Sequence, residues 1–180
     1  MSSTEYKGNF MIRKSNENDI ELLLALFAEA RATIAALGID QWQNGYPDID
    51  VIKRDIARGE SYVYEKDGEV LATFAMLKTK EPTYDRIFEG AWQSADDADY
   101  TAIHRFAIAV RARGQGIAGE ILAFAEEYSR TSYKYSLRID THEGNVVMRR
   151  MLLKNGFCYC GVIHLENGDA RVAYEKLLKT

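Results

Sequence analysis

The feature that most constrains the fold is a glycine-rich turn between an apolar run and a helix-forming run. The apolar residues 106–110 predict a buried strand, and residues 117–129 predict a helix. Between them lies Arg-Ala-Arg-Gly-Gln-Gly, residues 111–116. Glycines let backbone N–H groups come close to a ligand, and the positive end of a helix favours an anion. Together with the two arginines, these elements predict a binding loop for a pyrophosphate-bearing ligand.

Length and composition limit the other possibilities. A chain of 180 residues without repeats or linkers can bury a full core, so we expect a single domain over residues 1–180. The net charge of −4 argues against a general affinity for nucleic acid. We expect no membrane span, because the chain lacks a run of about 18 apolar residues, and we expect no secretory leader. Cys158 and Cys160 are poorly spaced for a disulfide or a metal, so we expect reduced thiols, no metal site and a cytoplasmic protein.

Apolar spacing and turn residues predict elements in the order βααβββαβαββ. Asp67-Gly68 and Asn167-Gly168 carry the turn signal of β-hairpins, and helices are expected to end near Gly38, Gly59 and Gly156. This order predicts an α+β fold, a mixed sheet with helices on both faces. The expected strands are residues 10–14, 62–66, 69–78, 100–110, 135–140, 157–165 and 170–178, and the expected helices begin at Asn16 or Asp19, at Asp48 or Asp50, at Ile117 and at Asn145.

One alternative for the glycine turn is a dinucleotide site. Residues 114–119 spell G-x-G-x-x-G, and Asp140 ends the next expected strand at roughly the spacing of a ribose-binding acid. A nicotinamide or flavin domain needs several strand–helix units in series, however, and only one surrounds this turn. The residues that follow are also too few for a substrate domain. A dinucleotide-dependent oxidoreductase is therefore the most distant alternative.

Two motifs resemble those of the GNAT N-acetyltransferases. The first, Q/R-x-x-G-x-G/A, reads Arg111-Ala-Arg-Gly114-Gln-Gly116 in this chain, with Ile117-Ala118 after it. The second, N-x-x-x-x-x-L-Y-x-K-x-G-F, is matched in part by residues 145–157. The expected order of elements also fits that family from the first strand to the last. The resemblance implies the GNAT fold, a mostly antiparallel sheet of six to seven strands whose central strands splay apart.

The resemblance implies that acetyl-CoA is the cosubstrate and that the glycine turn holds its diphosphate. It also implies that free backbone at Ile108 and Val110 pairs with the pantetheine amides, where an N–H can stabilise the oxyanion of the attacked thioester. Asn145 matches an asparagine near the pantetheine and thiol, and it also suits a helix cap. The positions that match the diphosphate loop are Arg113, Gly114, Gln115, Gly116, Ile117 and Ala118.

The second motif departs from the family at one position. The tyrosine that often protonates the leaving thiolate falls at Leu152, which has no proton to donate. General-acid help is commonly worth roughly 10²–10⁴-fold, yet a thiol with a pKa near about 8.5 is already a fair leaving group. Tyr159, Tyr128 or an ordered water are candidates for the role. The departure also keeps a non-catalytic coenzyme A or acyl-CoA binding protein open as an alternative.

Two histidines are candidates for the base that deprotonates an acceptor amine, whose ammonium has a pKa near about 10.4. His104 lies on the strand that leads into the glycine turn, where relatives often carry a catalytic Glu or His. His142 shares one strand face with Arg138 and Asp140, and an Asp140–His142 couple would raise its basicity. The competing interpretations are a structural His104 and a structural Arg138–Asp140 pair.

Four aromatic residues are candidates for contact with the acceptor. Trp42 and Tyr46 follow the first helix, and Tyr84 and Trp92 lie in the long connection after the third strand. The competing interpretation is that the two tryptophans close the core. We therefore expect an acetyl-CoA-dependent N-acetyltransferase that acts on a primary amine of a small molecule or peptide, by direct attack in a ternary complex. Its partners are expected to be coenzyme A and the amine, without nucleic acid or membrane, and homodimers are common among relatives.

Overall fold

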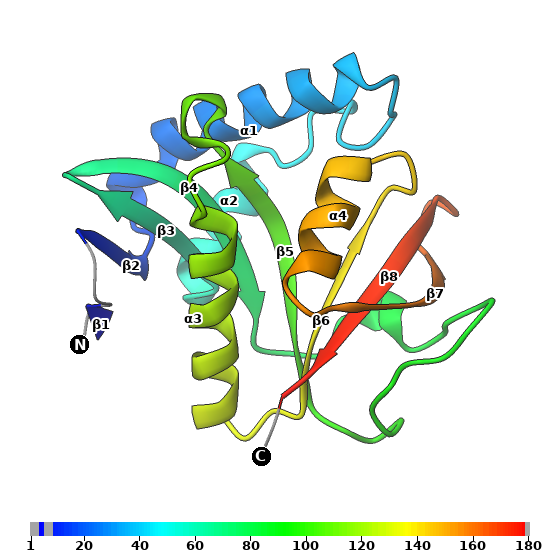
Figure 1. Ribbon diagram of the computed structural model, residues 1–180. Coiled ribbons are helices and arrows are strands. Elements are labelled where there is room, and N and C mark those ends of the chain that lie inside the picture. The colour runs from blue at the N-terminus through cyan, green and yellow to red at the C-terminus, as the bar shows by residue number, and fades with distance from the viewer. Residues whose placement is uncertain (1–3, 6–8, 179–180) are drawn as a thin grey trace. The chain divides into compact units, whose positions relative to one another are not determined.

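The computed structural model describes residues 4–5 and 9–178 (Figure 1). Contacts divide the chain into two compact units, of which the first joins Met1–Met76 to Arg105–Ile121 and the second joins Leu77–His104 to Leu122–Thr180. Strand β5 (Tyr100–Ile108) and helix α3 (Ile117–Thr131) each contribute residues to both units. The single domain expected over residues 1–180 stays a prediction.

Antiparallel strands that pair in sequence order form the sheet of the first unit. Its β3–β4 hairpin turns at Asp67 and Gly68, whose φ angles are 53° and 79°. Such positive φ values are the geometry that the Asp-Gly pair predicts for a two-residue hairpin. The strands are β1 (Thr4–Glu5), β2 (Phe10–Lys14), β3 (Ser61–Lys66) and β4 (Glu69–Leu77).

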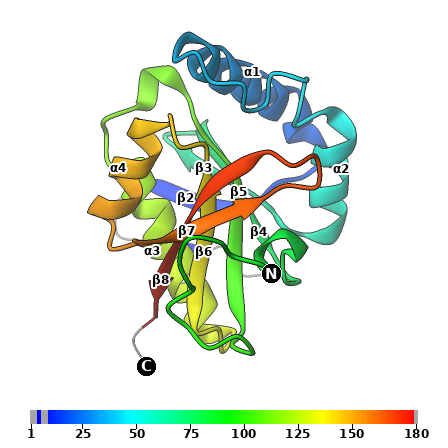
Figure 2. The same cartoon turned by 90° about the vertical axis from the view of Figure 1, so that its right-hand side faces the viewer.

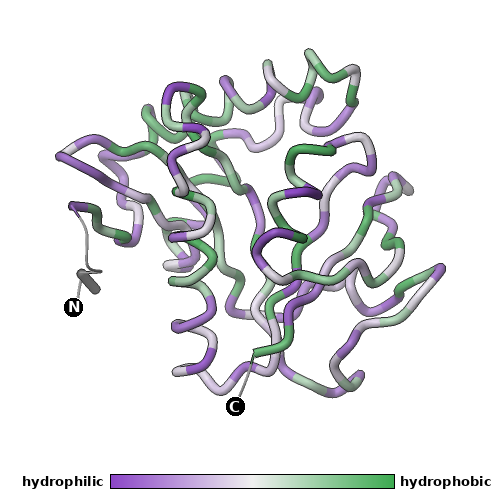
Figure 3. Tube along the Cα trace, viewed as in Figure 1, coloured by the Kyte–Doolittle hydropathy of each residue, from purple (hydrophilic) through white to green (hydrophobic). Residues whose placement is uncertain are grey.

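Two helices complete the first unit. Helix α1 (Ile20–Ala36) follows a 3-10 turn whose N-cap is Asn16, and α2 (Ile49–Arg58) begins where the Asp48 carboxylate accepts the Val51 N–H at 2.9 Å. Gly59, in the left-handed conformation, ends α2. The trace of α1 alternates between hydrophobic and hydrophilic stretches (Figure 3). Its buried residues are Leu23, Leu26, Phe27, Ala30 and Ile34, which recur at helical spacing.

The second unit is built on strands in the order β5-β6-β8-β7, so the last strand of the chain is inserted beside β6 (Figure 2). The β5–β6 pair is parallel and the other pairs are antiparallel. Helix α4 (Val146–Lys154) precedes β7 and begins at Asn145. The strands added here are β6 (Ser136–Thr141), β7 (Cys158–His164) and β8 (Ala170–Leu177).

Strands β5 and β6 pair over only a short length. Their ladder runs from Tyr100–Ser136 to Ala102–Arg138 and stops there, although both strands continue. The backbone of β6 after Arg138 therefore has no β5 partner. This separation is the splay of central strands that the family resemblance implies.

The connection between β4 and β5 packs closely against β7. Phe88 and Val162 form an isolated bridge with two backbone hydrogen bonds of 2.8 Å. A Cβ on Gly90 would lie 2.0 Å from the Cys160 carbonyl oxygen, and one on Gly161 would lie 2.5 Å from the Phe88 oxygen. Only glycine fits at these two contacts, because the opposing atoms belong to the backbone.

The expected elements occur in the expected order, and the α+β fold is confirmed. Strand β5 was expected to reach Val110 but ends at Ile108, so the expected end is wrong. Residues Val110–Ala112 form a 3-10 turn instead, closed by a bond from the Ala112 N–H to the Ala109 oxygen. No sequence pattern predicts the short β1 or the 3-10 turn Pro82–Tyr84. Within residues 4–5 and 9–178, no helix has the length and apolar character needed to cross a membrane.

Candidate active site

The glycine turn leaves its backbone N–H groups available. Gly114 and Gly116 have φ angles of 78° and 86°, and a Cβ built on either would meet no atom within 4 Å. Across the part of the chain that the structure describes, no hydrogen bond engages the N–H groups of residues 114–118. Unengaged N–H groups at the start of α3 coincide with the positive end of that helix. The turn can therefore accept an anion without displacing a protein group.

The two arginines of the turn make different contacts. Arg111 forms an ion pair with Glu69, and both side chains are more than half exposed. Arg113 donates to the Thr33 hydroxyl on α1 at 3.1 Å and to the Ile108 carbonyl at 3.4 Å. Arg113 is thus held at the turn without a carboxylate partner among the described residues, so its charge remains available to a diphosphate.

The end of β5 carries the backbone expected to meet pantetheine. Ile108 is half-buried, and the Val110 side chain is 54% exposed. The Val110 N–H donates to Glu29 Oε2 at 2.9 Å. Pantetheine contact at Ile108 and Val110 stays a prediction, and at Val110 it requires this carboxylate to give up its bond.

The loop between β6 and α4 holds Asn145 and His142 in the second unit. Asn145 Oδ1 accepts the Met148 N–H at 3.1 Å, which is the helix cap considered from the sequence. His142 Nδ1 accepts the Gly144 N–H at 3.0 Å. A neutral imidazole with Nδ1 as acceptor carries its proton on Nε2. His142 can therefore take a proton only by releasing this loop bond.

His104 has a carboxylate neighbour that the sequence did not single out. Its Nε2 lies 3.5 Å from Glu81 Oε2, and its ring stacks on Tyr84 with centroids 5.8 Å apart. The other oxygen of Glu81 accepts from the N–H and the hydroxyl of Thr83 at 3.1 and 2.9 Å. A fixed carboxylate stabilises the imidazolium that forms when histidine takes a proton. Glu81 is the N-cap of the 3-10 turn Pro82–Tyr84. Nothing in the sequence around Glu81 indicated that it lies near His104.

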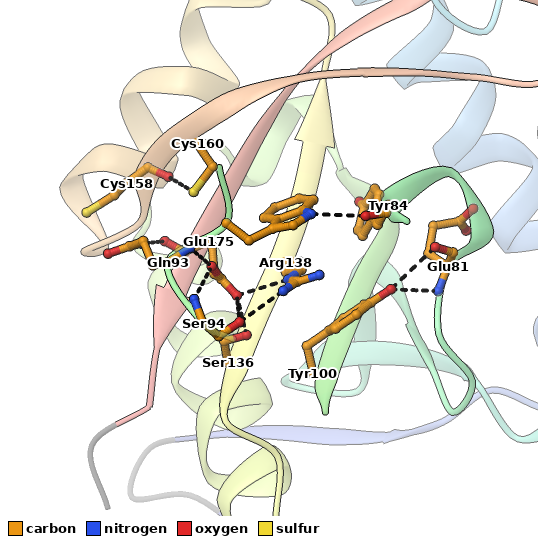
Figure 4. Close-up of polar contacts among 11 residues, drawn as sticks. Glu81, Tyr84, Gln93, Ser94, Tyr100, Ser136, Arg138, Cys158, Cys160 and Glu175 are labelled. Carbon is orange, nitrogen blue, oxygen red and sulfur yellow. Dashed lines mark hydrogen bonds and ion pairs between the residues drawn. The ribbon is translucent and has the colours of Figure 1, made fainter. Parts of the chain in front are cut away.

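Arg138 and Asp140 share a strand face, as alternation predicts, but the proposed pair between them is wrong. Arg138 Nε donates to Glu175 Oε1 at 2.9 Å (Figure 4). Asp140 Oδ2 instead accepts the Tyr84 hydroxyl at 2.7 Å. The cause is the position of β8, which puts Glu175 directly opposite Arg138 in the ladder. Asp140 is likewise joined to Tyr84, and no bond to His142 exists among the described residues.

Glu175 is the centre of a buried polar network. It is 0% exposed and accepts hydrogen bonds from Ser136, Arg138 and the 93–94 segment (Figure 4). Burial by itself raises the pKa of this carboxyl, but the bonds from Ser136, Ser94 and Arg138 outweigh burial and lower the pKa below its ordinary value. The network fastens the connection after β4 to strands β6 and β8.

Two of the four aromatic candidates pack inside the second unit. Trp92 and Tyr100 lie on the Arg138 guanidinium, each ring centroid 4.1 Å from its central carbon. Trp92 Nε1 also donates to the Tyr84 carbonyl at 3.0 Å, and Tyr84 is 1% exposed. The structure thus gives Tyr84 and Trp92 structural contacts, and an acceptor contact at either stays a prediction.

The other two aromatic candidates, Trp42 and Tyr46, are half-buried in the first unit. Their ring centroids are 6.3 Å apart, and the Tyr46 hydroxyl accepts from Arg105 Nη1 at 2.8 Å. Arg105 also pairs with the buried Asp55 at 2.5 Å. Burial raises the pKa of Asp55 despite this arginine. No motif pointed to Arg105 or Asp55, and Arg105 is unusual for its φ of 51° within a strand.

The two cysteines differ in exposure and are expected to differ in reactivity. Cys158 is exposed, whereas Cys160 is 4% exposed and burial raises the pKa of its thiol to about 11. Because the thiolate is the reactive form, a disulfide reagent at pH 8 should label one thiol per native chain and the second only after unfolding. Cys158→Ser should remove the native-state labelling and Cys160→Ser should not. Equal native labelling of both thiols would contradict this assignment.

The described residues contain no group of three or more His, Cys, Asp or Glu side chains arranged to hold a metal ion.

Comparison with known proteins shows that the chain matches a protein family. Residues 26–157 match the model of the acetyltransferase (GNAT) family. The chain is 26% identical over 145 residues to an uncharacterized N-acetyltransferase, YesJ, of Bacillus subtilis (strain 168), which covers 79% of this chain and 78% of that protein.

Solved structures of GNAT-family acetyltransferases also match this chain. A GNAT-family acetyltransferase from Streptococcus agalactiae 2603 superposes with a TM-score of 0.87 at 36% identity, covering 97% of this chain and 99% of the other. A GNAT-family acetyltransferase from Listeria monocytogenes 4b F2365 superposes with a TM-score of 0.73 at 20% identity, over 98% and 100% of the two chains, and shares the fold. The motifs, the splayed strands and these matches together show that the chain belongs to the GNAT family of N-acetyltransferases.

Proposed function

We propose that this protein transfers the acetyl group of acetyl-CoA to a primary amine of a small molecule or peptide, by direct attack within a ternary complex. The observation that carries the proposal is the set of unengaged N–H groups at residues 114–118, at the start of α3. These groups match the family's coenzyme A loop in sequence, and they are oriented by two glycines with positive φ. The diphosphate would bind there, with Arg113 beside it.

The acceptor amine must lose a proton before it attacks, since an alkyl ammonium has a pKa near about 10.4. We assign this step to His104, because the fixed carboxylate of Glu81 stabilises the imidazolium that results. The amine nitrogen then forms a bond to the acetyl carbon, the C–S bond breaks, and its electron pair leaves with sulfur. His142 remains the second candidate base, with Trp42 and Tyr46 as candidate acceptor contacts.

A thermal-denaturation panel tests the cosubstrate. A ligand at 100 times its Kd stabilises a protein by roughly 2.7 kcal/mol, which corresponds to about 5–11 °C in a chain of this size. We expect that rise with acetyl-CoA and coenzyme A, and none with NAD, NADP or FAD. A rise with a dinucleotide alone would overturn the proposal. Release of free thiol in the presence of a library of amines then identifies the acceptor.

Replacing His104 by alanine is expected to lower kcat by roughly 10²–10⁴-fold, the usual worth of a general base, with little change in KM for acetyl-CoA. His142→Ala is expected to have the smaller effect, because its Nδ1 is engaged by the loop. His164→Ala is the matched control, since this third histidine is exposed. Steady-state thiol release measures all three, and full activity in both the His104 and His142 variants would reject a histidine base.

A specific observation supports a second candidate, a coenzyme A binding protein without catalysis. Leu152 stands at the position of the family's tyrosine and is 0% exposed, so it is a core residue of α4. A protein of this kind would be stabilised by acetyl-CoA yet release no thiol with any amine. The thiol-release assay therefore separates the two candidates.

A further inference from the structure

Arg149 on α4 is held in one orientation by two neighbours. Its Nε donates to the Tyr174 hydroxyl on β8 at 3.0 Å, and its Nη1 donates to the Glu143 carbonyl at 2.9 Å. The bond to Tyr174 raises the pKa of Arg149, which keeps the side chain cationic. Nη2 makes no hydrogen bond within the described residues. The guanidinium therefore has a fixed charge and one free edge.

Tyr174 is the buried hydrogen-bond partner of Arg149. It is 1% exposed, and it lies opposite Ile139 at the point where β6 has lost its β5 partner. Its ring contacts that of Tyr159, with centroids 5.9 Å apart. A buried ring presents its hydroxyl in one place, so it determines where the arginine points.

Arg149 lies one turn after Asn145, the N-cap of α4, and its backbone N–H donates to the Asn145 carbonyl at 3.0 Å. The family resemblance implies that Asn145 lies near the thiol of the cosubstrate. The side chain expected to protonate the thiolate is absent, because Leu152 is a buried leucine. A cation one helical turn after Asn145 could instead stabilise the thiolate as an anion.

We propose that the Arg149 guanidinium stabilises the coenzyme A thiolate as the C–S bond breaks, with Tyr174 as the positioning residue. The inference rests on the proposed function. When the amine attacks, the C–S electron pair moves to sulfur, and the thiolate accepts hydrogen bonds from the free edge of the guanidinium. No proton is transferred from Arg149. The thiolate is protonated by solvent after release, and the proton lost from the acetylated amine also goes to solvent.

The test compares coenzyme A with desulfo-coenzyme A, which lacks the sulfur, by calorimetry at pH 6.5 and pH 9.5. A thiol with a pKa near about 8.5 becomes mostly thiolate across this interval. A charged hydrogen bond to the thiolate is expected to make coenzyme A bind roughly tenfold tighter at the higher pH, relative to desulfo-coenzyme A. The titratable groups that face Arg149 are Tyr174, Tyr159 and Glu143, and their ionisation affects both ligands alike.

The variants separate a catalytic role from a structural one. Arg149→Met should abolish the pH-dependent preference for coenzyme A and lower kcat about tenfold or more, with KM for acetyl-CoA nearly unchanged. Tyr174→Phe should reduce the preference in part, because the Glu143 carbonyl still holds Nη1. Arg150→Met, an exposed neighbour on the same helix, should retain the preference in full.

The outcomes are distinct. If coenzyme A and desulfo-coenzyme A bind with the same ratio at both pH values, or if Arg149→Met keeps the preference, the inference is overturned while the proposed function stands. If neither ligand binds to the wild-type protein, the proposed function fails and the inference fails with it. A preference that disappears only in Tyr159→Phe would assign the thiolate to another group and would also overturn the inference.

Discussion

Replacing Gly116 with valine is expected to weaken acetyl-CoA binding by at least 10²-fold in a protein that still folds. The residue has a φ of 86°, and its Cβ direction points into open space beside N–H groups that make no protein hydrogen bond. A valine side chain would occupy part of this open space, next to those N–H groups. Loss of two hydrogen bonds to a charged diphosphate costs roughly 3–6 kcal/mol, or about 10²–10⁴-fold in Kd.

The cost in stability is a separate quantity. A residue with a side chain in the left-handed region loses roughly 1–2 kcal/mol. Gly168→Val is the matched control, because Gly168 has a φ of 89° and open space around its Cβ direction but lies in the β7–β8 turn. We expect both variants to lose similar stability in urea denaturation and only Gly116→Val to lose binding by calorimetry. Normal affinity in Gly116→Val would refute the loop as the diphosphate site.

The largest expected loss of stability comes from Glu175→Gln. Arg138 is 3% exposed, and Glu175 is its carboxylate partner. Glutamine keeps the shape of the side chain but removes the charge, so the arginine remains buried without an anion. Breaking one partner of a buried pair costs roughly 3–5 kcal/mol, and a loss of about 3 kcal/mol lowers the Tm of a chain of this size by roughly 6–12 °C.

Glu127→Gln provides the control, because Glu127 pairs with Arg130 at 3.5 Å on the surface and its side chain is 57% exposed. An exposed pair contributes roughly 0–1 kcal/mol, so this change should be nearly silent. Because the pKa of Glu175 is lowered in the folded state, its stabilisation is present above the ordinary glutamate pKa of about 4.3 and is lost as the pH falls through the folded value. The difference between wild type and Glu175→Gln should therefore shrink in acid. A constant difference from pH 7 to pH 3 would contradict the role assigned to the carboxylate.

Local signals predicted the fold well. The Asp67-Gly68 turn, the Asp48 cap and the glycine after each of several helices depend only on neighbouring residues, so the sequence contains the full information. The end of β5 was missed because the apolar run continues to Val110, past the point where the strand ends and the 3-10 turn Val110–Ala112 begins. Ala109 donates its N–H to the Leu71 carbonyl, and the chain turns directly afterwards.

In the candidate site, too, features encoded by neighbouring residues were predicted and features that depend on distant contacts were not. The glycine loop was recognised because a motif encodes it in consecutive residues. The partners of the candidate polar groups were not, since Glu81 meets His104 and Glu175 meets Arg138 only through the packing of the β4–β5 connection and the insertion of β8 beside β6. Alternation along β6 gave the correct face for Arg138 and Asp140 but could not reveal which strand would lie alongside.

The Phe88–Val162 bridge has a consequence for aggregation of the protein at high concentration. Strand β7 is the outermost strand of the second unit, and an outermost strand with unpaired backbone groups can recruit a strand from another molecule. Here both backbone groups of Val162 are already bonded to Phe88, and the two close glycine contacts keep that segment in place. At Val162 the β4–β5 connection thus occupies the edge position where a strand from another molecule would add, and such strand addition is a route to aggregation.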